Sequence, residues 1–407
     1  MSTACITFDK GCPRMAVDVA LLFEYLETNG WKLVDHVEDA DLILAATCGV
    51  HETAEESGFA ALAHIDSRRK RGSRLVAIGC LAGICEERLV STYPDVVVVP
   101  PSKSSRLDEI IGARVKLANI PEVRNRAPYI DRALRSMGRT TERPSRRLVR
   151  SVSHAFRIDA AHGRLREAFA ASRAGARGTC SLRVAWGCAG GCTYCAIRFA
   201  TGELRSKPLD DVLAEFDAGL AEGFARFELI AGDVGCWGYD IGTSIVELLT
   251  GLFERAGAFR LTVDDFNPRW LIRYRETLVP LLAANSEKIE SFVVPIQSGS
   301  DRVLEQMRRG YVSSEVEATL AGLRAAAPRL KMITHVLVGF PGETDADFED
   351  TCNLLTAVRF NRVDAYPYAD RPNTLASLLP DKVPGEVIKA RCALLKAEFP
   401  TVVAKYL

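Results

Sequence analysis

Residues 181–195 read SLRVAWGCAGGCTYC, an apolar run that ends in glycine and is followed at once by three cysteines. The run has the length and composition of a buried strand. Cys188, Cys192 and Cys195 then share one short loop, and the two adjacent glycines between them permit tight backbone turns. Three thiolates at this spacing can bind three irons of a 4Fe-4S cluster and leave the fourth iron open.

A structural zinc ion is the alternative ligand for this loop. Zinc would need a fourth cysteine or histidine close by, in a pattern such as two paired CxxC motifs, and the loop offers no such pattern. We therefore expect an iron-sulfur cluster here. A zinc-binding scaffold without catalytic activity is kept as an alternative interpretation.

The apolar run is the first of six strand-like runs, each separated from the next by a helical segment. The six runs are SLRVAWG, RFELIAG, FRLTVDD, SFVVPIQ, MITHVLVGF and RVDAYPYA. Six consecutive βα units predict an open (β/α)6 partial barrel over residues 180–383, with its site at the carboxyl ends of the strands. Residues 384–407 are expected to form a closing helix.

Residues 1–118 also alternate short apolar runs with amphipathic segments, which predicts a doubly wound parallel α/β sheet. Cys12, Cys48 and Cys80 lie at or just beyond the ends of three of these runs, ACITF, DLILAAT and RLVAIG. Because parallel strands present their carboxyl ends along one edge, these thiols can converge and bind a second cluster. Alternatively, they are three buried cysteines that act as small hydrophobic residues.

Residues 119–179 interrupt this rhythm and carry 14 arginines against five acidic residues. We interpret them as a solvated, Arg-rich connector, and a dedicated anion-binding surface is the alternative. Over the whole chain of 407 residues, Lys plus Arg equals Asp plus Glu at 52 each. The net charge therefore generates no strong field to attract a polyanion such as nucleic acid.

The chain shows no secretory signal at its N-terminus and no apolar stretch approaching the ~20 residues that span a bilayer. We expect a cytoplasmic protein with no membrane partner. In a reducing compartment, 12 cysteines are better explained by metal or redox chemistry than by a disulfide framework.

The two cysteine trios and the segments around them resemble the radical S-adenosylmethionine (SAM) methylthiotransferases. The matching segments are GCPRMAVDVALL, ADLILAATCGVHETAEES, IGCLAG, GCAGGCTYCAIRFATGELRSKP, PIQSGSDRVLEQMRRGY, VLVGFPGETDADFEDT and YADRPNTLAS. The resemblance implies SAM and two 4Fe-4S clusters as cofactors. The barrel cluster would cleave SAM to a 5'-deoxyadenosyl radical, and the N-terminal cluster would hold the sulfur. An external electron donor such as flavodoxin or ferredoxin is implied as well.

The resemblance also implies roles for individual barrel residues. Those expected to bind the cofactor are Tyr194, Gly232, Asp264, Gln297, Ser298, Gly339, Pro341 and Tyr368. The catalytic candidates are Arg205, Asp233 and His335. Arg205 can equally be an ordinary surface arginine, and a lone histidine in an apolar strand is often a satisfied core residue.

Two departures from the family pattern concern the substrate. Ala231-Gly232-Asp233 stands where relatives usually read Gly-Gln-Asp or Gly-Gln-Asn, and His335 stands where they usually carry Asp. Family members that modify tRNA or a ribosomal protein normally carry a further small β-barrel, the TRAM domain, which we do not expect here. We therefore expect insertion of sulfur, as thiol or methylthio, into an unactivated carbon of a small molecule, with nucleotide-like molecules as candidates. The alternative is a tRNA or ribosomal-protein methylthiotransferase without that domain.

Overall fold

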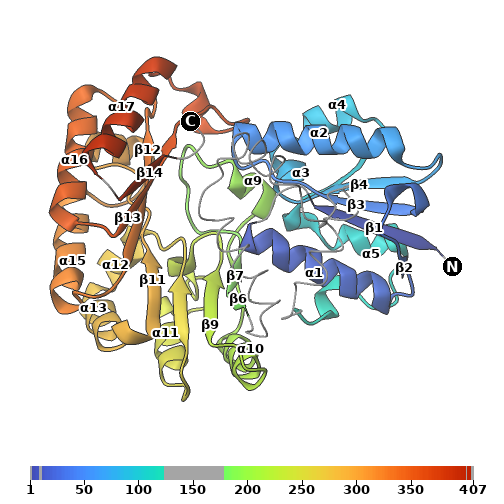
Figure 1. Cartoon of the computed structure of the whole chain (residues 1–407), viewed down its shortest axis with the longest axis horizontal. Helices are drawn as coiled ribbons and strands as arrows, with labels where there is room; N and C mark the ends of the chain where they lie inside the picture. Colours follow the sequence, from blue (N-terminus) through green and yellow to red (C-terminus); the bar gives the residue numbers. More distant parts are fainter. Residues whose placement is uncertain (1, 9–11, 123–177, 400, 405–407) are drawn as a thin grey trace, which may run out of the picture. The chain divides into compact units, whose positions relative to one another are not determined.

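The computed structural model describes residues 2–8, 12–122, 178–399 and 401–404. The chain divides into two compact units (Figure 1). The first comprises residues 1–176 and 196–202, and the second comprises residues 177–195 and 203–407. The connector expected at residues 119–179 lies almost wholly outside the described residues.

The first unit is built on a parallel sheet that has five strands in the described part of the chain, in the order β2-β1-β3-β4-β5. The strands are β1 (Thr3–Phe8), β2 (Lys32–Leu33), β3 (Leu42–Ala46), β4 (Arg74–Ile78) and β5 (Val97–Val99). The central strands β1, β3 and β4 are buried along most of their length, as expected for a parallel sheet covered on both faces. The predicted doubly wound domain is confirmed.

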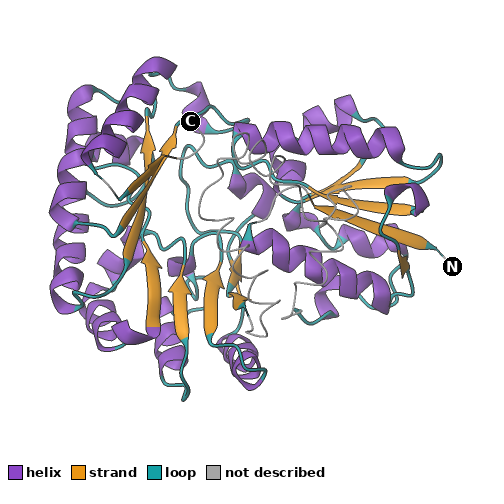
Figure 2. Ribbon diagram, in the orientation of Figure 1, coloured by secondary structure: helices purple, strands orange, loops and turns teal. Residues whose placement is uncertain are grey.

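Helices cover both faces of this sheet and form one apolar core on each (Figures 1 and 2). One face packs against α1 (Pro13–Thr28) and α5 (Arg106–Ile111). The opposite face packs against α2 (Glu52–Arg68), α3 (Cys80–Ile84), α4 (Glu86–Thr92) and α9 (Ile197–Thr201). The apolar positions of α1 and α2 recur at helical spacing, so that each helix buries one stripe.

Helix α9 follows Cys195 in sequence but belongs to the first unit by its contacts. Gly83 of α3 lies so close to α9 that a Cβ on this glycine would overlap the Cα of Ala200. The absence of a side chain at Gly83 therefore permits the close packing of these two short helices.

The second unit is built on a parallel sheet with seven strands among the described residues, in the order β14-β13-β12-β11-β10-β9-β6. The strands are β6 (Thr179–Arg183), β9 (Arg226–Ile230), β10 (Arg260–Val263), β11 (Ile289–Val293), β12 (Met332–Val338), β13 (Arg362–Pro367) and β14 (Val402–Ala404). The predicted α/β partial barrel is confirmed, because each of the six apolar runs overlaps one of these parallel strands.

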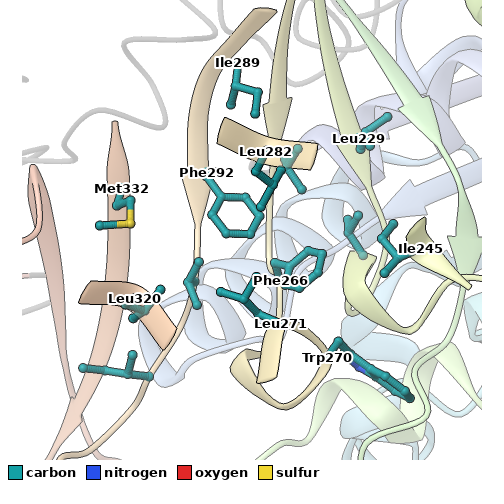
Figure 3. Close-up of a cluster of buried hydrophobic side chains, with 14 of the residues drawn as sticks. Leu229, Ile245, Phe266, Trp270, Leu271, Leu282, Ile289, Phe292, Leu320 and Met332 are labelled. Carbon is teal, nitrogen blue, oxygen red and sulfur yellow. The ribbon is translucent and has the colours of Figure 1, made fainter. Parts of the chain in front are cut away.

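Helices cover one face of this second sheet (Figure 2). They are α10 (Leu209–Ala221), α11 (Ile245–Phe253), α12 (Pro268–Arg273), α13 (Arg275–Ala284), α14 (Asp301–Gln306), α15 (Ser313–Ala326), α16 (Asp345–Val358) and α17 (Gly385–Glu398). Figure 3 shows part of the core between sheet and helices, where Phe266 and Phe292 meet Leu271 and Leu282. Each such buried side chain contributes about 1.5–3 kcal/mol to stability.

Short 3-10 helices complete the described elements. They are η1 (Val37–Asp39), η2 (Pro101–Lys103), η3 (Leu117–Asn119), η4 (Val234–Cys236), η5 (Ser286–Lys288) and η6 (Leu375–Leu378). No helix in the described ranges is both long and apolar enough to cross a membrane. Each of the 12 cysteines, all of which lie in those ranges, is a free thiol.

Two local features differ from the sequence expectation. The run SLRVAWG divides into β6 and a separate strand β7 (Ala185–Trp186), which pairs antiparallel with β8 (Arg205–Ser206). At the C-terminal end, α17 stops at Glu398, and β14 adds an edge strand that was not anticipated. The β-branched residues Thr401, Val402 and Val403 favour an extended backbone, and the pairing of Val402 with Val363 supplies the hydrogen-bonded neighbour.

Candidate iron-sulfur and cofactor sites

The loop after β7 carries the first cysteine trio, and all three cysteines are partly exposed. The Gly190 N–H donates to Cys188 Sγ at 3.1 Å. A Cβ on Gly190 would lie 3.1 Å from Cys188 Sγ and 3.8 Å from Cys192 Sγ. The missing side chain thus keeps a space free between two of the sulfurs, as a bound cluster requires.

A buried guanidinium lies beside this loop. Arg309 is only 5% exposed, and its Nη1 donates to Cys192 Sγ at 3.3 Å and to the Tyr194 hydroxyl at 3.4 Å. No carboxylate forms an ion pair with Arg309 among the residues that the structure describes. A buried cation without a carboxylate in direct contact is costly, so the site suits an anionic group such as three thiolates on a cluster.

Sequence reasoning missed Arg309. It lies in the segment MRRGY beside Arg308, which is exposed. Both residues are arginines, so the sequence does not show which of them is buried. Only the burial of one side chain and the solvation of the other reveal which arginine can act at the loop.

A second unassigned residue, Cys236, contacts the first trio. Its thiol is fully buried and donates to the Asp233 backbone carbonyl at 3.0 Å. A hydrogen bond from Cys236 lowers the pKa of Cys188, although burial of Cys188 opposes this effect. Its place in the 3-10 helix after β9 could have suggested such a contact, but a lone cysteine there is more often a small hydrophobic residue.

Asp233, a predicted catalytic residue, is 3% exposed, and its carboxylate is fully engaged by protein groups. Oδ1 accepts hydrogen bonds from the backbone N–H groups of Gly235 and Asn267 at 3.0 and 3.1 Å. Oδ2 accepts from Trp270 Nε1 at 2.8 Å. Burial raises the pKa of Asp233 despite these bonds. The carboxylate therefore orders the loop after β9, and a catalytic role for Asp233 stays a prediction.

Arg205, another predicted catalytic residue, is exposed in β8. Its guanidinium lies 4.5 Å from the centre of the Trp186 ring, directly across the β7–β8 pair. This contact is a surface cation–π interaction. The contact agrees with the alternative interpretation of Arg205 as an ordinary surface arginine. A role as substrate clamp stays a prediction.

His335 lies on the face of β12 opposite the helices. Burial alternates along this strand, and Val336 and Val338 belong to the core between sheet and helices, so His335 points to the other face. Its Nε2 lies 3.8 Å from Asp364 Oδ2, and its ring is edge-on to Tyr366 at 5.4 Å. A partly exposed histidine with a carboxylate nearby can transfer a proton, so His335 stays a catalytic candidate.

The predicted cofactor residues of β11, β12 and β13 gather at neighbouring strand ends. Gln297 has a φ of +68° and bridges to Val336, while Tyr368 N–H donates to Val338 O at 2.8 Å. Gly339 has a φ of +82°, and a Cβ there would overlap the side chain of Ile388. The missing side chain of Gly339 permits its close packing against α17, and a role of these residues in binding the cofactor stays a prediction.

The remaining predicted cofactor residues have separate surroundings. Ser298 is 1% exposed, and its hydroxyl accepts from the Ser300 N–H at 3.2 Å, so it supports the loop instead of facing solvent. Gly232 packs so tightly that a Cβ would overlap the Gly187 carbonyl oxygen. Asp264 is half-buried just after β10, and Pro341 is buried after β12.

The second trio lies at the carboxyl ends of β1, β3 and β4, which are neighbours in the first sheet. Cys12 caps α1 by accepting from the Met15 N–H at 3.4 Å, and Cys80 is the first residue of α3. Cys48 follows β3 by two residues. Burial, together with the nearby sulfurs of Cys12 and Cys48, raises the pKa of Cys80.

Neither trio brings three ligand atoms within 4.8 Å of one another. Among the described residues, only Cys188, Asp233 and Cys236 do so, and hydrogen bonds already engage that group. One tetrahedral zinc would need its sulfurs closer together than either trio holds them. In a cluster each thiolate binds a separate iron, so a cluster does not require all three sulfurs within reach of one metal ion.

Known proteins match both parts of the chain. The Radical SAM superfamily model matches residues 184–355, and the model of Uncharacterized protein family UPF0004 matches residues 4–100. A tRNA-2-methylthio-N(6)-dimethylallyladenosine synthase of Xanthomonas oryzae is 31% identical over 406 residues, 95% of this chain and 75% of the relative. A Verminephrobacter eiseniae protein of the same name is 30% identical over 404 residues, 96% of this chain and 80% of the relative. A probable threonylcarbamoyladenosine tRNA methylthiotransferase of Pyrococcus horikoshii is 26% identical over 386 residues, 95% of this chain and 81% of the relative.

Solved structures with the same fold are much more distant in sequence. The radical SAM methyltransferase TsrM from Kitasatospora setae has a TM-score of 0.60 at 15% identity, covering 97% of this chain and 79% of that chain. The cobalamin-dependent SAM radical enzyme OxsB has a TM-score of 0.53 at 13% identity, covering 87% and 51%. These likenesses support the fold alone.

The parallel partial barrel, the cysteine loop and the superfamily match together define a radical SAM enzyme. More particularly, the chain belongs to the radical SAM methylthiotransferase family, because relatives at least 30% identical cover most of both chains. The family expected from the sequence is therefore confirmed. Membership implies SAM and a 4Fe-4S cluster as cofactors.

Proposed function

We propose that this protein is a tRNA methylthiotransferase, which replaces a C–H hydrogen of a modified adenosine in tRNA by a methylthio group. The supporting observation is the 31% identity over 406 residues to relatives named for such a reaction. The sequence alone favoured a small, nucleotide-like substrate. The names of the relatives favour the alternative, a macromolecular substrate, and we adopt it.

We assign the first cluster to the barrel loop. Cys188, Cys192 and Cys195 would hold it, and the absent side chain of Gly190 leaves space between two of the sulfurs. When bound, this cluster supplies the electron that cleaves SAM, and thus the oxidising power to remove hydrogen from an unactivated carbon. Arg309 contributes the positive charge that offsets the thiolates.

We assign a second 4Fe-4S cluster to Cys12, Cys48 and Cys80, as the carrier of the sulfur that is transferred. Its support is the position of all three residues at the ends of adjacent parallel strands.

The test is product analysis with matched substrates. Anaerobically reconstituted protein is incubated with SAM, dithionite and one of three substrates: tRNA containing N6-dimethylallyladenosine, the free nucleoside, or ribosomal protein. We expect a methylthio-nucleoside by mass spectrometry only in the tRNA reaction, and tRNA binding that weakens as salt rises. The Cys188→Ala variant is the control and should form no product.

Other outcomes would assign the function differently. Product from the free nucleoside alone would favour a small-molecule substrate. Product on ribosomal protein alone would favour a ribosomal-protein methylthiotransferase. About eight irons per chain are expected for two clusters. If metal analysis finds one or two zinc ions per chain and no iron, the protein is a zinc-binding scaffold without this catalytic activity.

A further inference from the structure

Arg309 is held against the barrel loop by the backbone as well as by its own side chain. The loop residue Thr193 donates its N–H to Met307 O at 3.2 Å and its hydroxyl to Gln306 O at 2.9 Å. Arg308 and Gly310 both have positive φ values, +57° and +74°, so the chain turns sharply on either side of Arg309. This turn directs one arginine inward and leaves its neighbour exposed.

None of the hydrogen bonds of Arg309 goes to a carboxylate, although the charge of the buried Asp233 carboxylate also acts on its guanidinium. Nη2 donates to the Pro295 carbonyl at 2.7 Å, and Nε donates to the Tyr311 hydroxyl at 2.9 Å. Nη1 contacts Cys192 Sγ and the Tyr194 hydroxyl. Of these acceptors, only Cys192 carries a formal negative charge once it is a metal ligand. The guanidinium is therefore paired electrostatically with the cluster ligand set.

We propose that Arg309 raises the reduction potential of the barrel cluster. One-electron reduction by an external low-potential donor adds a negative charge to the cluster and removes nothing from the protein. The fixed positive charge of the buried Arg309, in contact with Cys192, stabilises that added charge more than it stabilises the oxidised form. Hydrogen bonds to cluster sulfurs act in the same direction. Arg309 acts through Cys192, so it is a positioning and tuning residue rather than a catalytic one.

The inference rests on the assignment of the cluster to Cys188, Cys192 and Cys195. Its test removes the other trio first, with Cys12, Cys48 and Cys80 all changed to Ala, so that one cluster contributes to the signal. Redox titration followed by electron paramagnetic resonance then measures the midpoint potential in four proteins. They are this parent, Arg309→Gln, Arg309→Lys and the exposed neighbour Arg308→Gln.

In Arg309→Gln, we expect the ratio of reduced to oxidised cluster at the parent's midpoint to fall about tenfold, a shift of ~59 mV for a one-electron couple. Arg309→Lys retains the charge and should shift less, and Arg308→Gln should match the parent. Full iron content with an unchanged potential in Arg309→Gln would overturn the proposal. If Arg309→Gln loses its iron, the midpoint potential of Arg309→Lys tests the proposal instead. Loss of iron in both variants would assign Arg309 a purely structural role.

The tuning of the cluster and the proposed function fail separately. A shifted potential without any methylthio-tRNA from the intact enzyme would leave Arg309 as the tuning residue and overturn only the substrate assignment. An unchanged potential in Arg309→Gln, together with methylthio-tRNA formed by the intact enzyme, would overturn the role of Arg309 and keep the substrate assignment.

Discussion

At the scale of single residues, the glycines of the barrel loop differ in what their missing side chains permit. A Cβ on Gly190 would lie 3.1 Å from Cys188 Sγ, whereas a Cβ on the adjacent Gly191 would have no atom within 4 Å. Both residues are partly buried. A side chain at Gly190 would therefore fill space beside the sulfurs, whereas a side chain at Gly191 would not.

This difference predicts opposite outcomes for two matched variants. Gly190→Val should lower the iron content from about eight to about four per chain, because the new side chain occupies the space between the sulfurs. Gly191→Val should keep the iron, since its side chain enters open space. Anaerobic metal analysis after reconstitution measures both. Equal iron in the two variants would show that the space at Gly190 is not used.

At the scale of elements, α14 and α16 are joined by one carboxylate. Asp347 lies in the first turn of α16 and accepts from the Thr344 N–H at 2.8 Å and the Thr344 hydroxyl at 2.6 Å. It also accepts from the Ser300 hydroxyl at 2.6 Å and from Arg302. Burial alone would raise the pKa of Asp347, but the bonds from Arg302, Ser300 and Thr344 lower it well below its usual range.

The lowered pKa predicts a pH-dependent contribution to stability. The stabilisation should be complete above the unfolded-state pKa of about 3.9 and should be lost as the pH falls towards the lower folded-state value. Asp347→Asn should cost about 1–3 kcal/mol at pH 7 and measurably less at pH 3, where the unfolded-state carboxyl is largely protonated and the folded-state one is still ionised. Urea unfolding of the metal-free protein at both values measures this. The exposed Asp350→Asn on the same helix is the control, and an equal loss at both pH values would contradict the assignment.

A second prediction at this scale concerns the packing of α3 on α9. Gly83→Ala places a Cβ against the backbone of Ala200 and should destabilise the first unit by about 1–3 kcal/mol. Gly322→Ala in α15 meets no atom within 4 Å and should stabilise the second unit by about 0.5–1 kcal/mol. Thermal unfolding of the metal-free variants gives both values. A neutral Gly83→Ala would mean that α9 can move away from α3.

At the scale of the whole molecule, the two cysteine trios belong to units with separate cores. Cys12, Cys48 and Cys80 lie in the first unit, and Cys188, Cys192 and Cys195 lie in the second. Each unit has its own sheet and its own buried apolar residues. Loss of one metal site should therefore leave the fold around the other intact.

This separation predicts that the two chemical steps can be uncoupled. Changing Cys12, Cys48 and Cys80 to Ala should halve the iron content and abolish methylthio transfer, while SAM cleavage to 5'-deoxyadenosine continues. Cys188→Ala should abolish both reactions. Chromatographic measurement of 5'-deoxyadenosine and of the modified nucleoside distinguishes these outcomes. Methylthio product from the triple variant would show that its sulfur comes from elsewhere.

The sequence by itself determined the fold class, the two trios and the family. Strand-like runs alternate with helical segments, and each of Cys12, Cys48 and Cys80 stands at the same place in that rhythm, so parallel pairing alone brings them to one edge. These are local patterns, which can be recognised in a single sequence without knowledge of the tertiary contacts.

Only the tertiary structure decided which side chains face the barrel loop. Arg309 and Arg308 are identical in type, yet one is buried at Cys192 and the other is exposed. Asp233 is a catalytic candidate from the sequence, and only the structure shows that Gly235, Asn267 and Trp270 donate hydrogen bonds to its carboxylate. Burial and hydrogen-bond partners depend on residues distant in sequence, and no spacing along the chain encodes them.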